Sequence, residues 1–120
     1  MMIQQSSVAL LVGLLCSCLL GCQQDRNDES PVRIGMMPKL MGISFFDAAG
    51  RGAHEAAGEL GVDLTYDGPT EDNTEQQAEM IDAWVAQGID VIAVAPNDPD
   101  AIAPTLSSAR DQGVMVITWD

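Results

Sequence analysis

Residues 89–120 read IDVIAVAPNDPDAIAPTLSSARDQGVMVITWD, and this stretch decides the predicted fold. Residues 89–95 form an apolar run that is rich in β-branched side chains and ends at Pro96, which predicts a strand buried on both faces. Asp98 and Pro99 predict the start of a helix, because an aspartate can cap free N–H groups and proline has no N–H to leave unpaired.

The predicted helix has one apolar stripe at positions i, i+4 and i+7: Ile102, Leu106 and Ala109. Gly113 can take the left-handed conformation that ends a helix, and residues 114–118 predict a second buried strand. A strand–helix–strand unit requires parallel strands and a right-handed crossover. Asn97, Asp98 and Asp120 should therefore gather beyond the carboxyl ends of the strands, where open α/β sheets bind ligands.

The preceding part of the chain predicts one more strand and helix. Residues 32–37 are a short apolar strand, and a helix is expected from Ser44, its candidate cap, to about Leu60, with Gly61 ending it. The expected apolar positions of this helix are Phe45, Ala49, Ala53, Ala56 and Leu60.

A second strand and helix follow. Residues 62–66 predict a strand, and Asn73 with Gln76 three residues later resembles a capping box that opens a helix over residues 74–87. Gly88 ends this helix. The side chains expected on its inner face are Ala78, Ile81 and Val85, with Trp84 beside them.

Alternation of strands and helices predicts an α/β fold, a three-layer sandwich around a parallel sheet. We expect the strand order 2-1-3-4, which puts the switch point between the ends of the first and third strands. Pro38, Lys39, Asn97 and Asp98 should face one another there, with Asp120 nearby.

Composition and charge restrict the classes of function that we expect for this chain. The formal net charge of −13 repels nucleic acid, so no nucleic-acid partner is expected. The three cysteines, Cys16, Cys18 and Cys22, all lie near the start, and His54 is the single histidine. We therefore expect no metal site, no cofactor and no catalytic residues, because neither an acid–base constellation nor a phosphate loop is present.

The first residues predict an export signal. Residues 8–20 are apolar but shorter than the roughly 20 residues that span a bilayer. Residues 19–22, LLGC, resemble a bacterial lipobox, which makes Cys22 the lipidation site, and residues 15–18 are a weaker alternative. Residues 1–7 contain no Lys or Arg, unlike most export signals, and a buried core helix is the competing interpretation.

The predicted organisation has three parts. Residues 1–21 are a lipoprotein signal peptide, and residues 22–31 are a polar, flexible tether to a lipid anchor in the membrane. Residues 32–120 are a partial ligand-binding lobe.

Three stretches resemble the amino-terminal lobe of periplasmic sugar-binding proteins of the ribose-binding type. They are residues 35–61, residues 65–82 (TYDGPTEDNTEQQAEMID) and residues 94–120. Within this family the PKL, YDGPT and TWD motifs are most similar to autoinducer-2-binding lipoproteins and rhamnose-binding proteins of ABC importers.

The resemblance implies a set of ligand-binding residues. Lys39 of PKL and Asp120 of TWD match positions that contact autoinducer-2. Phe45 and Phe46 match a pair that stacks on the sugar in ribose-binding relatives, although at least one of them is expected to be core. Asn97 matches an asparagine at the cleft of several sugar binders.

The resemblance also implies a non-enzymatic protein in the periplasm or cell envelope. It would pass a small sugar-like ligand to an ABC transporter permease, and would be monomeric when full length. Family members have two lobes, so the chain is expected to be a fragment with weak or no ligand binding of its own. The alternatives are a ribose- or rhamnose-type binding protein, the lobe of a sugar-responsive regulator, and an enzyme on the same fold.

Overall fold

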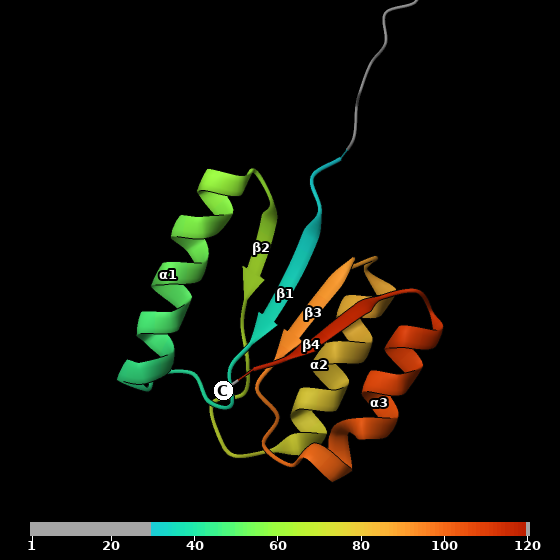
Figure 1. The fold of residues 1–120 in the computed structure, drawn as a ribbon. Coiled ribbons are helices and arrows are strands. Elements are labelled where there is room, and N and C mark those ends of the chain that lie inside the picture. The colour runs from blue at the N-terminus through green and yellow to red at the C-terminus, as the bar shows by residue number, and fades with distance from the viewer. Residues whose placement is uncertain (1–29, 120) are drawn as a thin grey trace, which may run out of the picture.

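The computed structural model describes residues 30–119, which form seven alternating strands and helices (Figure 1). In chain order these are β1 (Arg33–Met37), α1 (Ser44–Leu60), β2 (Asp63–Tyr66), α2 (Thr74–Ala86), β3 (Val91–Val94), α3 (Pro99–Asp111) and β4 (Met115–Thr118). The predicted order of elements is confirmed, and the boundaries differ from those expected by two residues at most.

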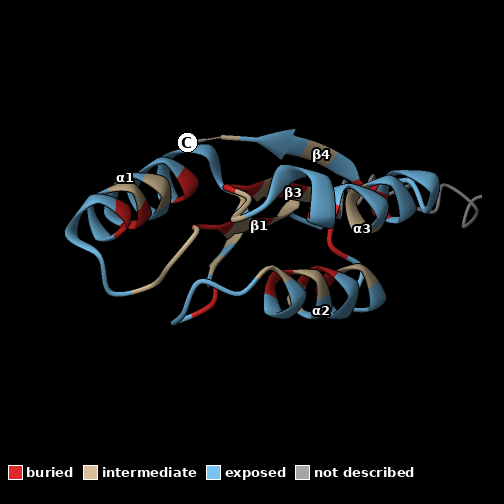
Figure 2. Cartoon of the chain, turned by 90° about the horizontal axis from the view of Figure 1, so that it is seen from below, coloured by how far each residue is buried: buried red, intermediate tan, exposed pale blue. Residues whose placement is uncertain are grey.

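The four strands form one parallel sheet in the order β2-β1-β3-β4, as predicted. Helices α2 and α3 lie side by side on one face, and α1 packs against β2 on the other (Figures 1 and 2). The main core lies under α2 and α3. Its buried side chains are Met37, Ile81, Trp84, Ile89, Ile92, Val94, Ile102, Ala109 and Val114.

Helix α1 differs from the prediction in the face that it buries. Its buried residues are Phe46, Gly50 and Ala57, whereas Phe45 is 63% exposed and Leu60 is 75% exposed. Glycine has no side chain to count as apolar, so Gly50 did not mark the inner face. The ring of Tyr66 lies so close that a Cβ at Gly50 would be 2.7 Å from its Cε1 atom.

The expected cap of α1 is also wrong. Ile43 holds the N-cap position without a side-chain hydrogen bond, and Ser44 is already the first helical residue. By contrast, Asn73 caps α2 by accepting the Gln76 N–H at 2.9 Å. Asp98 caps α3 in the same way, as expected, by accepting two backbone N–H groups at 3.0 Å.

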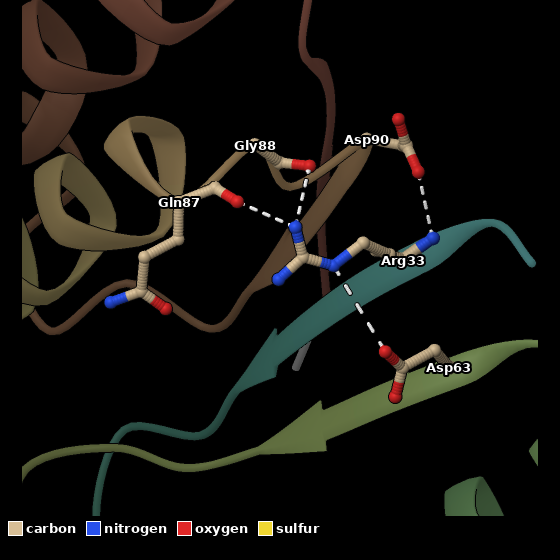
Figure 3. Close-up of polar contacts among 5 residues, drawn as sticks. All are labelled: Arg33, Asp63, Gln87, Gly88 and Asp90. Atoms are coloured by element: carbon tan, nitrogen blue, oxygen red, sulfur yellow. Dashed lines mark hydrogen bonds and ion pairs between the residues drawn. The ribbon is translucent and has the colours of Figure 1, made fainter. Parts of the chain in front are cut away.

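Arg33 connects three elements at the amino edge of the sheet (Figure 3). Its Nη1 atom donates to the two carbonyls that directly follow α2, at 2.5 Å to Gln87 and 3.2 Å to Gly88, and its backbone N–H donates to the Asp90 carboxylate at 2.8 Å. Its ion pair with Asp63 spans 4.0 Å between exposed side chains and therefore adds little. Positive charge at a helix carboxyl end also favours α2 through its dipole.

Strand β4 is not buried on both faces, contrary to the prediction. Met115 is 61% exposed and Ile117 is 49% exposed (Figure 2). Ile117 pairs with Ala93, which pairs with Met36, so these side chains share the face on which α1 packs. Helix α1 covers this face next to β2 and, through Phe46, at Trp119. The β4 part of that face therefore presents apolar side chains to solvent.

Candidate functional site

The candidate site lies at the carboxyl edge of the sheet, where three strands end at one level. Met37 pairs with Val94, and Val94 pairs with Thr118, so the residues that follow these strands start side by side. Trp119 continues the alignment, because its N–H donates to the Val94 carbonyl at 3.1 Å. Parallel pairing thus assembles the edge from chain segments far apart in sequence.

The loops after β1 and β3 are joined directly. The Asn97 Nδ2 atom donates to the Lys39 carbonyl at 3.2 Å, and the Ala95 N–H donates to the Met37 carbonyl at 2.8 Å. The predicted proximity of Lys39 and Asn97 is therefore confirmed. Asp98 follows Asn97 directly in sequence, but its side chain caps α3.

Gln77 is a site residue that the sequence reasoning missed. It lies on α2, is fully buried, and hydrogen-bonds to the loops after both β1 and β3. A polar residue on the buried face of an amphipathic helix was the available signal, because buried polar groups need specific partners. Gln77 lies one turn before Ile81 on the same face.

The YDGPT motif supports the loop that contains Lys39. The Met41 N–H donates to the Pro69 carbonyl at 2.8 Å. Gly68 packs so tightly that a Cβ there would lie 3.0 Å from the Pro38 carbonyl oxygen. The motif therefore packs against the loop that contains Lys39 and supports it.

Three aromatic side chains meet beside these loops. The ring of Phe46 makes edge-to-face contacts with Phe45 at 5.2 Å and with Trp119 at 5.8 Å between centroids. Phe46 is buried and Phe45 is exposed, which confirms that one member of the pair is in the core. The indole Nε1 of Trp119 is buried and has no hydrogen-bond partner among the described residues.

Tyr66 anchors the start of α1 near the same edge. Its hydroxyl donates to the Phe46 carbonyl at 2.7 Å. Burial raises the pKa of this hydroxyl above its ordinary value, and the negative charge of Asp47 raises it further. The neutral phenol therefore keeps the donor that holds the aromatic cluster against β2.

A hollow of about 440 Å³ opens among these loops and is lined by Lys39, Pro96, Pro99, Thr118 and Trp119. A larger hollow of about 850 Å³ lies at the opposite, amino edge of the sheet, and its lining residues include Ile89 and Gly113. We favour the smaller hollow as the ligand site, because it lies where the carboxyl ends of the strands and the polar loop groups meet.

Some predicted positions fall outside the described residues. These are Asp120, the lipidation site Cys22, the signal peptide over residues 1–21 and most of the tether. Within residues 30–119, no helix is long and apolar enough to cross a membrane. The same residues contain no group of three or more His, Cys, Asp or Glu side chains that could hold a metal ion.

A family model described as a periplasmic binding protein domain matches residues 34–120. The chain belongs to the periplasmic binding protein family. Two curated relatives of this family are the ribose import binding protein RbsB of Bacillus subtilis, 25% identical, and the D-ribose/D-allose-binding protein of Pseudomonas aeruginosa, 27% identical. Each alignment covers 94% of this chain, but only 38% and 37% of the relatives.

Solved structures of periplasmic binding proteins share the fold. LsrB from Clostridium saccharobutylicum in complex with AI-2 is 32% identical, with a TM-score of 0.73 over 74% of this chain and 27% of that one. A sugar ABC transporter from Actinomyces odontolyticus is 37% identical, with a TM-score of 0.68 over 72% of this chain and 28% of that one. A binding protein from Actinobacillus succinogenes with bound D-allose is 28% identical, with a TM-score of 0.71 over 75% of this chain and 32% of that one.

Proposed function

We propose that the chain is the amino-terminal ligand-binding lobe of the sugar-binding component of an ABC importer. The observation that carries this proposal is the hydrogen bond between Asn97 and the Lys39 carbonyl, which joins two strand-end loops beside a hollow. The names of the relatives, which refer to ribose, allose and AI-2, support a small polyhydroxylated ligand.

Each predicted residue has a proposed part in binding. Lys39 donates to ligand oxygens, and Asp120 accepts from hydroxyl groups, with which a carboxylate bonds strongly. Asn97 contributes polar contacts from the loop after β3. Phe45 offers its exposed ring for stacking, while the buried Phe46 holds that ring in place.

Autoinducer-2 is the first proposed ligand, and a ribose- or rhamnose-type monosaccharide is the alternative. Binding involves no chemical reaction in this proposal. A second lobe would close over the ligand, and the closed protein would engage the membrane permease.

The proposed location is the periplasm or cell envelope. Residues 1–21 would direct export, Cys22 would carry the lipid anchor, and residues 22–31 would form the tether. Mass spectrometry of the mature protein from a bacterial host tests the anchor. Acylation at Cys22 that disappears in Cys22→Ser is expected, and an unmodified, uncleaved amino terminus would contradict it.

A nuclear magnetic resonance titration of the isotope-labelled chain tests ligand binding. Ribose, allose, rhamnose and autoinducer-2 are compared with leucine as a non-sugar control. We expect at least one sugar to shift the amide signals of Lys39, Asn97 and Trp119, with a dissociation constant of about 1 mM or weaker for one lobe alone. Of the weak or absent binding expected for one lobe, the proposal commits to weak binding. Shifts confined to Ile89 and Gly113 at the opposite edge, or none with any sugar, would refute it.

A further inference from the structure

The carboxamide of Gln77 is fully buried and forms three hydrogen bonds at the carboxyl edge of the sheet. Its Nε2 atom donates to the Ala95 carbonyl at 2.9 Å and to the Pro38 carbonyl at 3.4 Å, and its Oε1 atom accepts the Asn97 N–H at 2.9 Å. Carbonyl groups only accept and an N–H only donates, so these partners fix the orientation of the amide.

These bonds join the two loops that form the candidate site. The Pro38 carbonyl immediately precedes Lys39, while the Ala95 carbonyl and the Asn97 N–H flank Pro96, which has no N–H of its own. A single side chain from α2 therefore fastens both loops. The bond from Asn97 Nδ2 to the Lys39 carbonyl is a second link between the same loops, and Lys39 lines the hollow.

We propose that Gln77 is the positioning residue of the sugar site. It never touches the ligand, but it sets the spacing between Lys39 and Asn97 before a sugar arrives. Binding groups that are held in place beforehand lose less conformational freedom on binding, so the affinity is higher. This inference rests on the proposed function, because it assigns Gln77 a part in binding at the same site.

The role requires a buried donor and acceptor on one side chain of this length. Methionine fills a similar volume but leaves the Asn97 N–H and two carbonyl oxygens without partners. Glutamate would direct carboxylate oxygens at the Ala95 and Pro38 carbonyls. Asparagine is one methylene shorter and would not reach both loops.

The test compares Gln77→Met with two control variants. Gln76→Met changes the neighbouring exposed residue of α2 and removes no link between the loops. Ile81→Val destabilises the same helix by removing a buried methylene and leaves every polar bond in place. Each variant is measured by amide hydrogen exchange without ligand and by the sugar titration described above.

Gln77→Met should make the Asn97 amide exchange at least about tenfold faster, while the amides of Ile92 and Val94 keep their protection. The initial slope of the sugar-induced shifts should fall roughly 10–100-fold, the range that outer-shell partners contribute at metal sites. Ile81→Val should lower the stability without changing that slope, and Gln76→Met should change neither.

Each outcome has a distinct meaning. If wild type binds sugar and Gln77→Met binds it equally well, Gln77 is only structural and this inference alone is overturned. If affinity follows stability across Gln77→Met and Ile81→Val alike, the positioning role is again refuted. If no sugar shifts any wild-type amide, the proposed function fails and the inference fails with it.

Discussion

Gly35→Ala is the sharpest test of the packing in the main core. A Cβ at Gly35 would overlap Cε3 of Trp84 and lie 2.6 Å from Cζ3 of the same ring, whereas carbon atoms pack at about 3.5–4.0 Å. The ring must therefore move by about 1 Å in a core where Trp84 is only 8% exposed. Overpacking of this kind lowers the free energy of unfolding by about 1–3 kcal/mol. Alanine also restricts the unfolded chain, which raises that free energy by about 0.4–1 kcal/mol.

We expect Gly35→Ala to lower the free energy of unfolding by about 1–2 kcal/mol, measured by circular dichroism in urea. The control is Gly52→Ala on α1, where the new Cβ would meet no atom within 4 Å apart from its chain neighbours and the nearby backbone of its own helix, and helix propensity predicts a gain of about 0.5–1 kcal/mol. Trp84→Phe should cost less in the Gly35→Ala background than in wild type, because the smaller ring leaves room for the methyl group. A loss below about 0.5 kcal/mol for Gly35→Ala, or no coupling to Trp84, would refute the packing argument.

Two further predictions concern the ends of the sheet. Arg33→Gln should lower the free energy of unfolding by about 1 kcal/mol, because it removes the bonds to the Gln87 and Gly88 carbonyls that follow α2. Arg51→Gln, at an exposed position of α1, should change it by less than about 0.5 kcal/mol, and equal effects of the two substitutions would contradict the part given to Arg33. Tyr66 is the single tyrosine, so its absorbance titration should have a midpoint above 10.0 that decreases in Asp47→Asn. Because the folded pKa of Tyr66 is raised, the stabilisation from its hydroxyl is complete below pH 10.0. That stabilisation is lost as pH rises through the folded pKa, when the donor to the Phe46 carbonyl ionises. A midpoint at or below 10.0 would contradict the inference that partial burial and Asp47 raise this pKa.

The sequence predicted the sheet and most helix boundaries because those signals are local. Asn73 and Asp98 are followed by free N–H groups in the same turn, so a cap can be recognised without knowing the fold. The stripe on α3 was equally readable: Ile102 and Ala109 are each 1% exposed. The inner face of α1 was misread because Gly50 has no side chain, and only the ring of Tyr66 shows that it is a contact.

The candidate site was predictable in part. The proximity of Lys39 and Asn97 could be predicted, because parallel strands bring their carboxyl ends to one edge of the sheet. The burial of Gln77 could have been predicted from its place on the apolar face of the helix, but its partners could not. They are backbone groups 18 to 39 residues away, and no sequence pattern identifies backbone partners at that separation.

Residue order alone therefore determined the alternation of strands and helices, the strand order 2-1-3-4 and the edge at which polar loops meet, since each depends on local conformation and short, right-handed connections. The tertiary structure decided which ring of the Phe45–Phe46 pair is buried, which face of α1 packs, and which side chain joins the loops. Those outcomes depend on how surfaces from distant segments of the chain fit together. Because the interior is closely packed, only one arrangement of these side chains fits.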